Sequence, residues 1–240
     1  MKIFPAIDLQ GGRVVRLTQG DYGRVTRYDV EPEEAARSFV RAGAKYVHIV
    51  DLDGAKDGSA ANLSTIARVL RDGRLFAEVG GGIRDMARVE AYLAAGAGRV
   101  ILGTAAVNDE AFLAEAVKTH GARVAVGVDA RDGRVAVNGW QTVTSLDSVE
   151  FCRRLRDMGV STVIYTDISR DGAMRGVNLD IYRTLIAIDG LEIVASGGVS
   201  ALEDVRALRD MGVPAAIVGK ALYSGALRLE DVLKEAEVGA

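Results

Sequence analysis

The feature that most constrains the fold of this chain is an internal repeat. The run Val79–Ile83, which reads Val-Gly-Gly-Gly-Ile, recurs 116 positions later as Ala195–Val199, and Ile101–Ala105 recurs at the same spacing as Ile217–Ala221. A long period of this kind indicates two structurally equivalent halves. We therefore predict one domain, residues 1–240, built from related halves of about 1–121 and 122–240.

Short runs rich in Val and Ile alternate with longer amphipathic segments, as in parallel strands buried on both faces and joined by crossover helices. The predicted strands are Ile3–Ile7, Tyr46–Val50, Phe76–Val79, Arg99–Leu102, Val124–Val128, Thr162–Tyr165, Glu192–Ala195 and Ala215–Val218. The predicted helices are Pro32–Ala42, Asn62–Arg71, Asp85–Ala95, Asp109–Thr119, Ser145–Met158, Leu179–Ile188, Ala201–Met211 and Leu229–Ala236. Strict alternation permits a doubly wound sheet or a closed barrel. The repeat favours the α/β class known as the (βα)8 TIM barrel with twofold-repeated half-barrels, because a closed ring places equivalent strands opposite one another.

Composition and charge exclude several classes of function. Of the 240 residues, 49% are hydrophobic and 26% charged, which suits a compact domain with a sizeable core. Acidic and basic residues are interleaved and give a net charge of −3, so no nucleic-acid partner is expected. One cysteine and two histidines provide neither an internal disulfide nor a zinc cluster, so no metal is expected. No apolar run reaches membrane-spanning length. We expect a soluble, cytoplasmic monomer with no membrane partner.

Aspartates end several of the predicted strands, where the active site of a (βα)8 barrel is built. Asp8 and Asp129 hold equivalent places in the two halves, each followed five residues later by Arg-Val, so they should face each other across the barrel mouth. Two separated carboxylates can take different protonation states and act as general base and general acid. This arrangement predicts proton transfer without a cofactor. The alternative is that each aspartate only accepts hydrogen bonds from backbone donors.

Paired glycines give a second, independent signal. They follow the third and seventh predicted strands, and a further glycine follows the fourth and the eighth: Gly81, Gly82, Gly103 with Thr104, Gly197, Gly198, and Gly219 with Lys220. Glycine lets the backbone approach a phosphate closely, and helix N-termini favour anions. The sequence therefore predicts two phosphate sites on opposite rims of the barrel. Tight turns between strand and helix are the alternative explanation for each glycine pair.

Several other side chains lie in segments that would overhang the mouth. Arg16 and the run Gln19–Tyr22, which contains Gly20, form a polar stretch long enough for a lid. Trp140, the single tryptophan, lies in a loop where it could stack on a planar ring or instead fill the core. His48 falls inside a strand among apolar neighbours, which favours a structural role over a catalytic one.

Five motifs together resemble one known family. They are Pro5–Leu9 (Pro-Ala-Ile-Asp-Leu), Gly12–Leu17, Gln19–Tyr22, Val79–Arg84 and Thr166–Gly172. Over essentially its whole length the chain resembles the (βα)8-barrel isomerases of histidine biosynthesis, the phosphoribosylformimino-5-aminoimidazole carboxamide ribotide isomerases. The resemblance implies an Amadori rearrangement of an N′-formimino aminoaldose bisphosphate to the aminoketose. It also implies that no metal or organic cofactor takes part and that the partner is a small bisphosphate substrate.

The resemblance further implies roles for individual residues. Asp8 would be the general base that removes the C2 proton of the ring-opened imine, and Asp129 the general acid that protonates the ribose ring oxygen, with Thr166 assisting there. Trp140 and Arg16 would contact the body of the substrate, and Asp171 would lie near it. The glycine segments would hold the two phosphates: Gly81, Gly82, Gly103 and Thr104 on one side, and Gly197, Gly198, Gly219 and Lys220 on the other.

Three alternatives remain open at this stage. The sister cyclase of the same pathway begins with a Cys-Leu-Asp-Val type of segment and has a lysine after the Gly-Arg-Val-Val run, where this chain has Arg16. A bifunctional relative that also isomerises phosphoribosylanthranilate has an arginine in the fifth-strand loop, which Val137–Gln141 lacks. A non-catalytic bisphosphate-binding regulator would keep the glycines and lose the acid and the base, yet Asp8 and Asp129 are both present.

Overall fold

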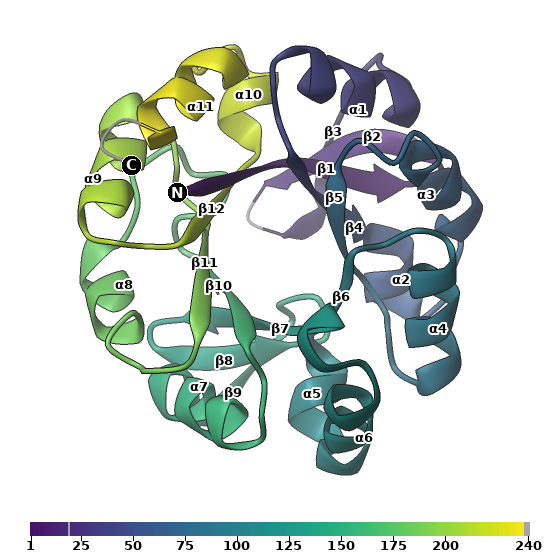
Figure 1. Cartoon of the computed structure of the whole chain (residues 1–240), viewed down its shortest axis with the longest axis vertical. Helices are drawn as coiled ribbons and strands as arrows, with labels where there is room; N and C mark the ends of the chain where they lie inside the picture. Colours follow the sequence, from purple (N-terminus) through teal and green to yellow (C-terminus); the bar gives the residue numbers. More distant parts are fainter. Residues whose placement is uncertain (19, 238–240) are drawn as a thin grey trace.

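A closed barrel of parallel strands forms the centre of the molecule, and helices surround it. The computed structural model describes residues 1–18 and 20–237, so Gln19 of the predicted lid and the last three residues lie outside the described residues. Figure 1 shows the ring of strands viewed along its axis, with the helices outside it. The sequence-based prediction of a (βα)8 barrel is confirmed.

Eight parallel strands of the described residues close the barrel in the order β10-β11-β12-β1-β4-β5-β6-β7, and β10 pairs again with β7. These barrel strands are β1 Lys2–Gln10, β4 Tyr46–Asp51, β5 Phe76–Gly80, β6 Arg99–Leu102, β7 Val124–Arg131, β10 Thr162–Asp167, β11 Glu192–Ser196 and β12 Ala215–Val218. Each of the predicted strands is therefore present, extended by a few residues in most cases.

Helices follow the barrel strands as predicted, and short additional ones open three of the loops. The main helices are α1 Pro32–Arg41, α3 Leu63–Leu70, α4 Met86–Ala94, α6 Glu110–His120, α7 Ser148–Asp157, α8 Leu179–Leu185, α9 Leu202–Asp210 and α11 Leu229–Glu237. The additional helices are α2 Leu52–Asp57, α5 Thr104–Asn108 and α10 Lys220–Tyr223, and a 3-10 turn, η1, spans Gly121–Arg123. Each of α2, α5 and α10 begins directly after a barrel strand, so their N-termini lie at the barrel mouth.

The two-residue period of the strands decides which side chains enter the barrel. Along β1, Ile3 and Ile7 pack outward against the helices, whereas Phe4 and Ala6 belong to the inner core. Asp8 continues this alternation, so its side chain points into the barrel interior at the carboxyl end of β1. The inner core is a small apolar cluster of Phe4, Ala6, Ile101, Ala125, Ile164, Val194, Ala215 and Ile217.

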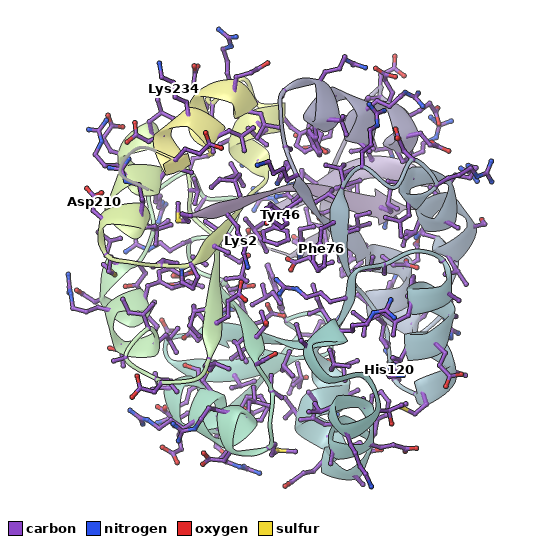
Figure 2. The ribbon with its side chains drawn as sticks, in the orientation of Figure 1. Lys2, Tyr46, Phe76, His120, Asp210 and Lys234 are labelled. Carbon is purple, nitrogen blue, oxygen red and sulfur yellow. The ribbon has the colours of Figure 1, made fainter. Side chains whose placement is uncertain are left out.

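A charged network fills the end of the barrel interior opposite the mouth. Glu78 is completely buried and accepts hydrogen bonds from Arg99, whose guanidinium lies over the rings of Phe4 and Phe76. His48 Nδ1 lies 2.7 Å from Glu78 Oε1, which agrees with the structural role predicted for this histidine. Figure 2 shows Tyr46 and Phe76 close together near the centre of the ring. Charge pairing and aromatic packing thus fill the end of the barrel opposite the mouth.

Two antiparallel hairpins were not predicted from the sequence. The first, β2 Arg13–Thr18 with β3 Asp21–Arg27, follows β1 where a polar loop was expected. The second, β8 Arg134–Val137 with β9 Thr142–Asp147, follows β7.

The predicted helix start at Ser145 is therefore wrong, since α7 begins only at Ser148. Residues 142–147 pair with β8 instead, and the Asp147 carboxylate caps α7 by accepting from the Val149 and Glu150 N–H groups at 3.1 Å.

Equivalent positions in the two halves make the same contacts. Asn62 donates to the Asp51 carboxylate at 2.7 Å, and Asn178, 116 positions later, donates to Asp167 at 2.8 Å. Each pair ties the loop after a barrel strand to the start of the following main helix. The repeat in the sequence thus corresponds to a repeat of side-chain interactions.

Candidate active site

A cavity of about 240 Å³ opens at the carboxyl ends of the barrel strands. Every residue that the sequence predicted for the site lines it: Asp8, Arg16, Gly20, Gly81, Gly82, Gly103, Thr104, Asp129, Trp140, Thr166, Asp171, Gly197, Gly198, Gly219 and Lys220. They come from seven barrel strands or the loops after them and from both hairpins. The closed barrel therefore brings together residues that are more than 200 positions apart in the sequence.

Asp8 lies at the end of β1 in an ion pair with Arg16 of β2. The antiparallel pairing of β1 with β2 sets Asp8 opposite Val15, the residue before Arg16, so the ion pair joins adjacent positions of the two strands. Their side chains are 13% and 14% exposed, so a substrate entering the cavity can reach both. Burial opposes the charge on Arg16, but Asp8 and Asp171 outweigh it and raise the pKa of the guanidinium above its ordinary value. Arg16 therefore stays charged.

Asp129 lies across the mouth at the corresponding place on β7. Its neighbour in the parallel register is Thr166 of β10. Burial raises the pKa of the Asp129 carboxyl, and hydrogen bonding by Trp140 and Thr166 opposes this rise only in part. A carboxyl in this environment retains its proton to higher pH than an ordinary aspartate, which suits a proton donor.

Asp171 shares these electrostatics. Its N–H donates to the Asp167 carbonyl at 3.0 Å in the turn after β10, and this turn directs it to the cavity. Burial raises the pKa of Asp171; Asp8 and Asp129 add to the rise, whereas Arg16 opposes it. The cavity therefore contains a second carboxyl able to hold a proton.

The paired glycines are required by the packing of neighbouring loops as well as by any ligand. Gly81 has φ +112°, and a Cβ there would lie 2.1 Å from the Asp51 carbonyl oxygen. Gly197 has φ +88°, and a Cβ would lie 2.7 Å from the Asp167 carbonyl oxygen. The alternative explanation of these pairs as tight turns is thus partly right, because the protein's own backbone accounts for them.

Gly103 behaves differently. Its φ is −103°, and a Cβ placed on it would meet nothing within 4 Å. It lines the cavity directly before α5, so the space beside its Cα is available to a ligand. The cavity therefore has room for an anion beside Gly103 and the first amides of α5.

Thr104 and Lys220 hold matching positions after the glycines of the fourth and eighth barrel strands. The Thr104 hydroxyl accepts from the Asn138 N–H of the second hairpin at 2.8 Å. Lys220 donates through Nζ to the Gly172 carbonyl at 2.6 Å. Each rim is thereby linked to the loop that overhangs it, and Lys220 gives one of the two rims a positive charge.

The two hairpins meet over the cavity. A Cβ on Gly20 would lie 2.2 Å from the six-membered ring of Trp140, so the indole lies directly against this glycine. Trp140 itself has φ +69°, a strained conformation for an aromatic residue. Tyr22 lies beside Gly139 and donates through its hydroxyl to the Leu52 carbonyl at 3.0 Å. Trp140 thus belongs to the roof of the cavity, which answers the question of whether it fills the core.

The residues that line the cavity but were not predicted for the site include Arg84 and His48. Arg84 directly follows the first glycine run, and its guanidinium lies against Gly58 in the loop after α2. Its position immediately after a predicted phosphate loop was the signal that could have found it. His48 was assigned a structural role, and it also faces the cavity above Glu78.

Among residues 1–18 and 20–237, no group of three or more His, Cys, Asp or Glu side chains is placed to hold a metal ion. No helix in this described part is long and apolar enough to cross a membrane.

Comparison with known proteins identifies the family of the chain. The family model described as "Histidine biosynthesis protein" matches residues 2–228. A relative from Brachyspira hyodysenteriae is 46% identical over 237 residues, covering 99% of this chain and 100% of the relative. A relative from Listeria innocua is 44% identical over 234 residues, covering 98% of each chain. Both are named imidazole-4-carboxamide isomerases, and the compound in each name carries two 5-phosphoribosyl groups. With this match over nearly its whole length, the chain belongs to the histidine biosynthesis protein family.

Proposed function

We propose that this protein is an aldose–ketose isomerase of histidine biosynthesis. It would convert the N′-formimino aminoaldose bisphosphate to the aminoketose by an Amadori rearrangement. The observation that carries the proposal is the cavity itself, which has one carboxylate on each side between two glycine-lined rims. The names of the full-length relatives, which specify an isomerase and two phosphoribosyl groups, support the same substrate class.

The reaction needs a proton donor and a proton acceptor on opposite sides of one sugar. Asp129 would protonate the ribose ring oxygen, which breaks the C1–O bond and leaves a ring-opened iminium ion. Asp8 would then remove the C2 proton, and the electrons of the C2–H bond would form a C1=C2 double bond and neutralise the iminium. The resulting enaminol would take up a proton at C1 and lose the proton of its C2 hydroxyl, which gives the ketone. Thr166, beside Asp129, would help to orient the ring oxygen. Protons alone move, so the proposed reaction requires no metal or organic cofactor.

The two rims would hold the two phosphates. Gly81, Gly82, Gly103 and Thr104 would bind one, and Gly197, Gly198, Gly219 and Lys220 the other. Exposed amides at the starts of α5 and α10 favour anions there. Holding both ends fixes the sugar between the carboxylates, which converts binding energy into orientation.

The sharpest test compares wild type with Asp8→Asn, assayed on the aminoaldose bisphosphate after chelator treatment. We expect wild-type turnover and a loss of at least about a thousandfold in the variant, because the amide cannot accept the C2 proton. Calorimetry should show that the variant still binds substrate, since the rims are intact. Unchanged turnover by Asp8→Asn would refute the assigned base, and binding without turnover by wild type would refute the isomerase.

Activity on phosphoribosylanthranilate is the second candidate. The loop between β8 and β9 contains Trp140 and no arginine, so a smaller substrate would lack a cation there. We therefore propose a monofunctional enzyme. Turnover of phosphoribosylanthranilate by the purified protein would reverse this choice.

We also propose a cytoplasmic monomer, and light scattering at a mass near 25.4 kDa would support the monomer.

A further inference from the structure

The inference concerns Arg16 and rests on the proposed function. In the structure this guanidinium is shared between two parts of the cavity. On one side it forms the ion pair with Asp8, the proposed base. On the other side it lies against Gly219, where a Cβ would come within 1.3 Å of Nη2.

Gly219 belongs to the proposed phosphate rim formed by Gly197, Gly198, Gly219 and Lys220. A Cβ at position 219 would meet the Arg16 guanidinium, so the absence of a side chain there leaves the space that the guanidinium occupies. Arg16 therefore occupies the surface of this rim that a bound phosphate would approach.

Other titratable groups surround the pair. The groups that face Asp8 and Arg16 are Asp171 from the loop after β10, Tyr223 from α10, Tyr28 after β3 and Tyr22 on β3. The Tyr223 hydroxyl donates to the Ala6 carbonyl at 2.9 Å and its ring packs on Tyr28, so this residue is held in place. Lys220 is likewise engaged with the Gly172 carbonyl.

We infer that Arg16 is a positioning residue that responds to phosphate. Without substrate it holds Asp8 in an ion pair, and a phosphate on the rim at Gly219 draws the guanidinium toward itself and frees Asp8 to act as the base.

Two general properties of the groups support this step. An opposite charge at ion-pair distance stabilises an ionised carboxylate, so a paired carboxylate accepts a proton less readily. A phosphate dianion carries more charge than a carboxylate, and the guanidinium fork can bind it through two parallel N–H donors. Binding energy from the remote phosphate would then be used at the reacting carbon, which raises turnover rather than affinity alone.

The experiment uses two substrate analogues, each lacking one of the two phosphates, with inorganic phosphite added in place of the missing group. For the analogue that leaves the Gly219 rim empty, phosphite should raise wild-type turnover by about tenfold or more, in line with release of a carboxylate from a cation. The variant Lys220→Met shows which analogue leaves the Gly219 rim empty. For that analogue, the variant should need a higher phosphite concentration for half-activation than wild type does. Thr104→Val, at the matching position on the other rim, should do so only for the other analogue.

Arg16→Met provides the decisive comparison. With this analogue, the variant should turn over at one rate with or without phosphite, and faster than wild type without phosphite, because nothing then restrains Asp8. Arg16→Lys keeps the charge and should keep part of the activation. A residue that only stabilises the hairpin would lower both rates together and leave the ratio unchanged.

The outcomes separate the two proposals. If wild type does not convert the intact bisphosphate, the proposed function fails and the inference falls with it. If wild type converts it but phosphite activates neither analogue, the function stands and the role of Arg16 is overturned. Phosphite activation that Arg16→Met and Arg16→Lys both retain in full would also overturn it.

Discussion

Asp129 and Asp171 differ from Asp8 in their surroundings. Asp8 forms an ion pair with Arg16, whereas burial is the main influence on the pKa of the other two carboxyls and raises it. A carboxyl whose pKa is raised by burial keeps its proton to higher pH. These surroundings support the proposal that the proton donor is one of the two buried carboxyls.

The acid assignment can be tested by amide substitution and by pH. We expect Asp129→Asn to lower turnover by about a hundredfold or more, because the amide cannot donate a proton to the ring oxygen. Since the pKa of Asp129 is raised, wild-type turnover should fall on the alkaline side only above the ordinary aspartate range, as the acid ionises. Asp171→Asn serves as the matched variant. If it alone removes the alkaline limb, the acid is Asp171 and the assignment of Asp129 is wrong.

The same raised pKa predicts a gain in stability on mutation. A carboxyl with a pKa raised by folding destabilises the folded state as pH rises from the ordinary aspartate value through the raised one. Asp129→Asn has no such penalty, so its Tm should exceed that of wild type at neutral pH, and the two should converge below the ordinary aspartate pKa. Thermal melts across pH check this. An equal difference at every pH would mean that packing, not ionisation, is responsible.

The elements show which patterns a sequence can reveal. All the barrel strands and main helices were predictable, because parallel strands buried on both faces give short apolar runs between amphipathic helices. The hairpins were not, since β3 is mostly exposed and polar and so lacks an apolar pattern. The predicted helix includes residues 145–147, but pairing with β8 makes them strand.

Much of the candidate site could also be predicted, for a geometric reason. In a closed parallel barrel, the residue at each strand end must reach the mouth, so Asp8 and Asp129 could be placed from the strand pattern, whereas Thr166 was predicted from the family resemblance. Contacts made by long side chains could not be predicted from the sequence. The contact of Arg16 with Gly219 and that of Arg84 with Gly58 depend on rotamers and loop paths that the sequence does not specify.

The Asp51–Asn62 pair and its counterpart Asp167–Asn178 permit a matched prediction. Asn62 bridges Asp51, Asp53 and the Gly12 N–H, whereas Asn178 makes one such bond, to Asp167. Asn62→Ala removes a hydrogen-bond donor from the fully buried Asp51 carboxylate and should lower the free energy of unfolding by about 2–3 kcal/mol. We expect Asn178→Ala to cost about half as much, and urea denaturation of both variants measures the difference. Equal losses would show that the halves rely on these bonds alike.

At the scale of the whole molecule, the charged network opposite the mouth holds four strands together. Glu78 of β5 joins Arg99 of β6 and His48 of β4, and Arg99 also donates to Thr162 of β10 at 3.3 Å. These bonds cross the interior and connect strands from both halves. The barrel should therefore unfold as one unit rather than half by half.

Removing one partner of this network tests its contribution. Arg99→Met leaves the Glu78 carboxylate buried without its main counter-charge and should destabilise the protein by about 3–5 kcal/mol. The double variant Arg99→Met with Glu78→Gln should recover part of this loss, since the uncompensated charge is gone. Denaturation monitored by circular dichroism and by Trp140 fluorescence should give coincident transitions. Separate transitions would mean that the halves unfold independently.

The glycine contacts also determine which parts of the molecule can be redesigned. At Gly82 and Gly198, as at the glycines before them, a Cβ would strike backbone of the neighbouring loop, at 2.1 and 2.5 Å. Random mutagenesis there would mainly yield misfolded chains. The hairpin tips around residues 20–22 and 138–141 meet largely through side chains, which can be exchanged together. A library that seeks new substrates for this scaffold should therefore retain both glycine rims and diversify the two tips jointly, so that selection changes the contacts to the sugar and its nitrogen substituent while the proposed binding of two phosphates is kept.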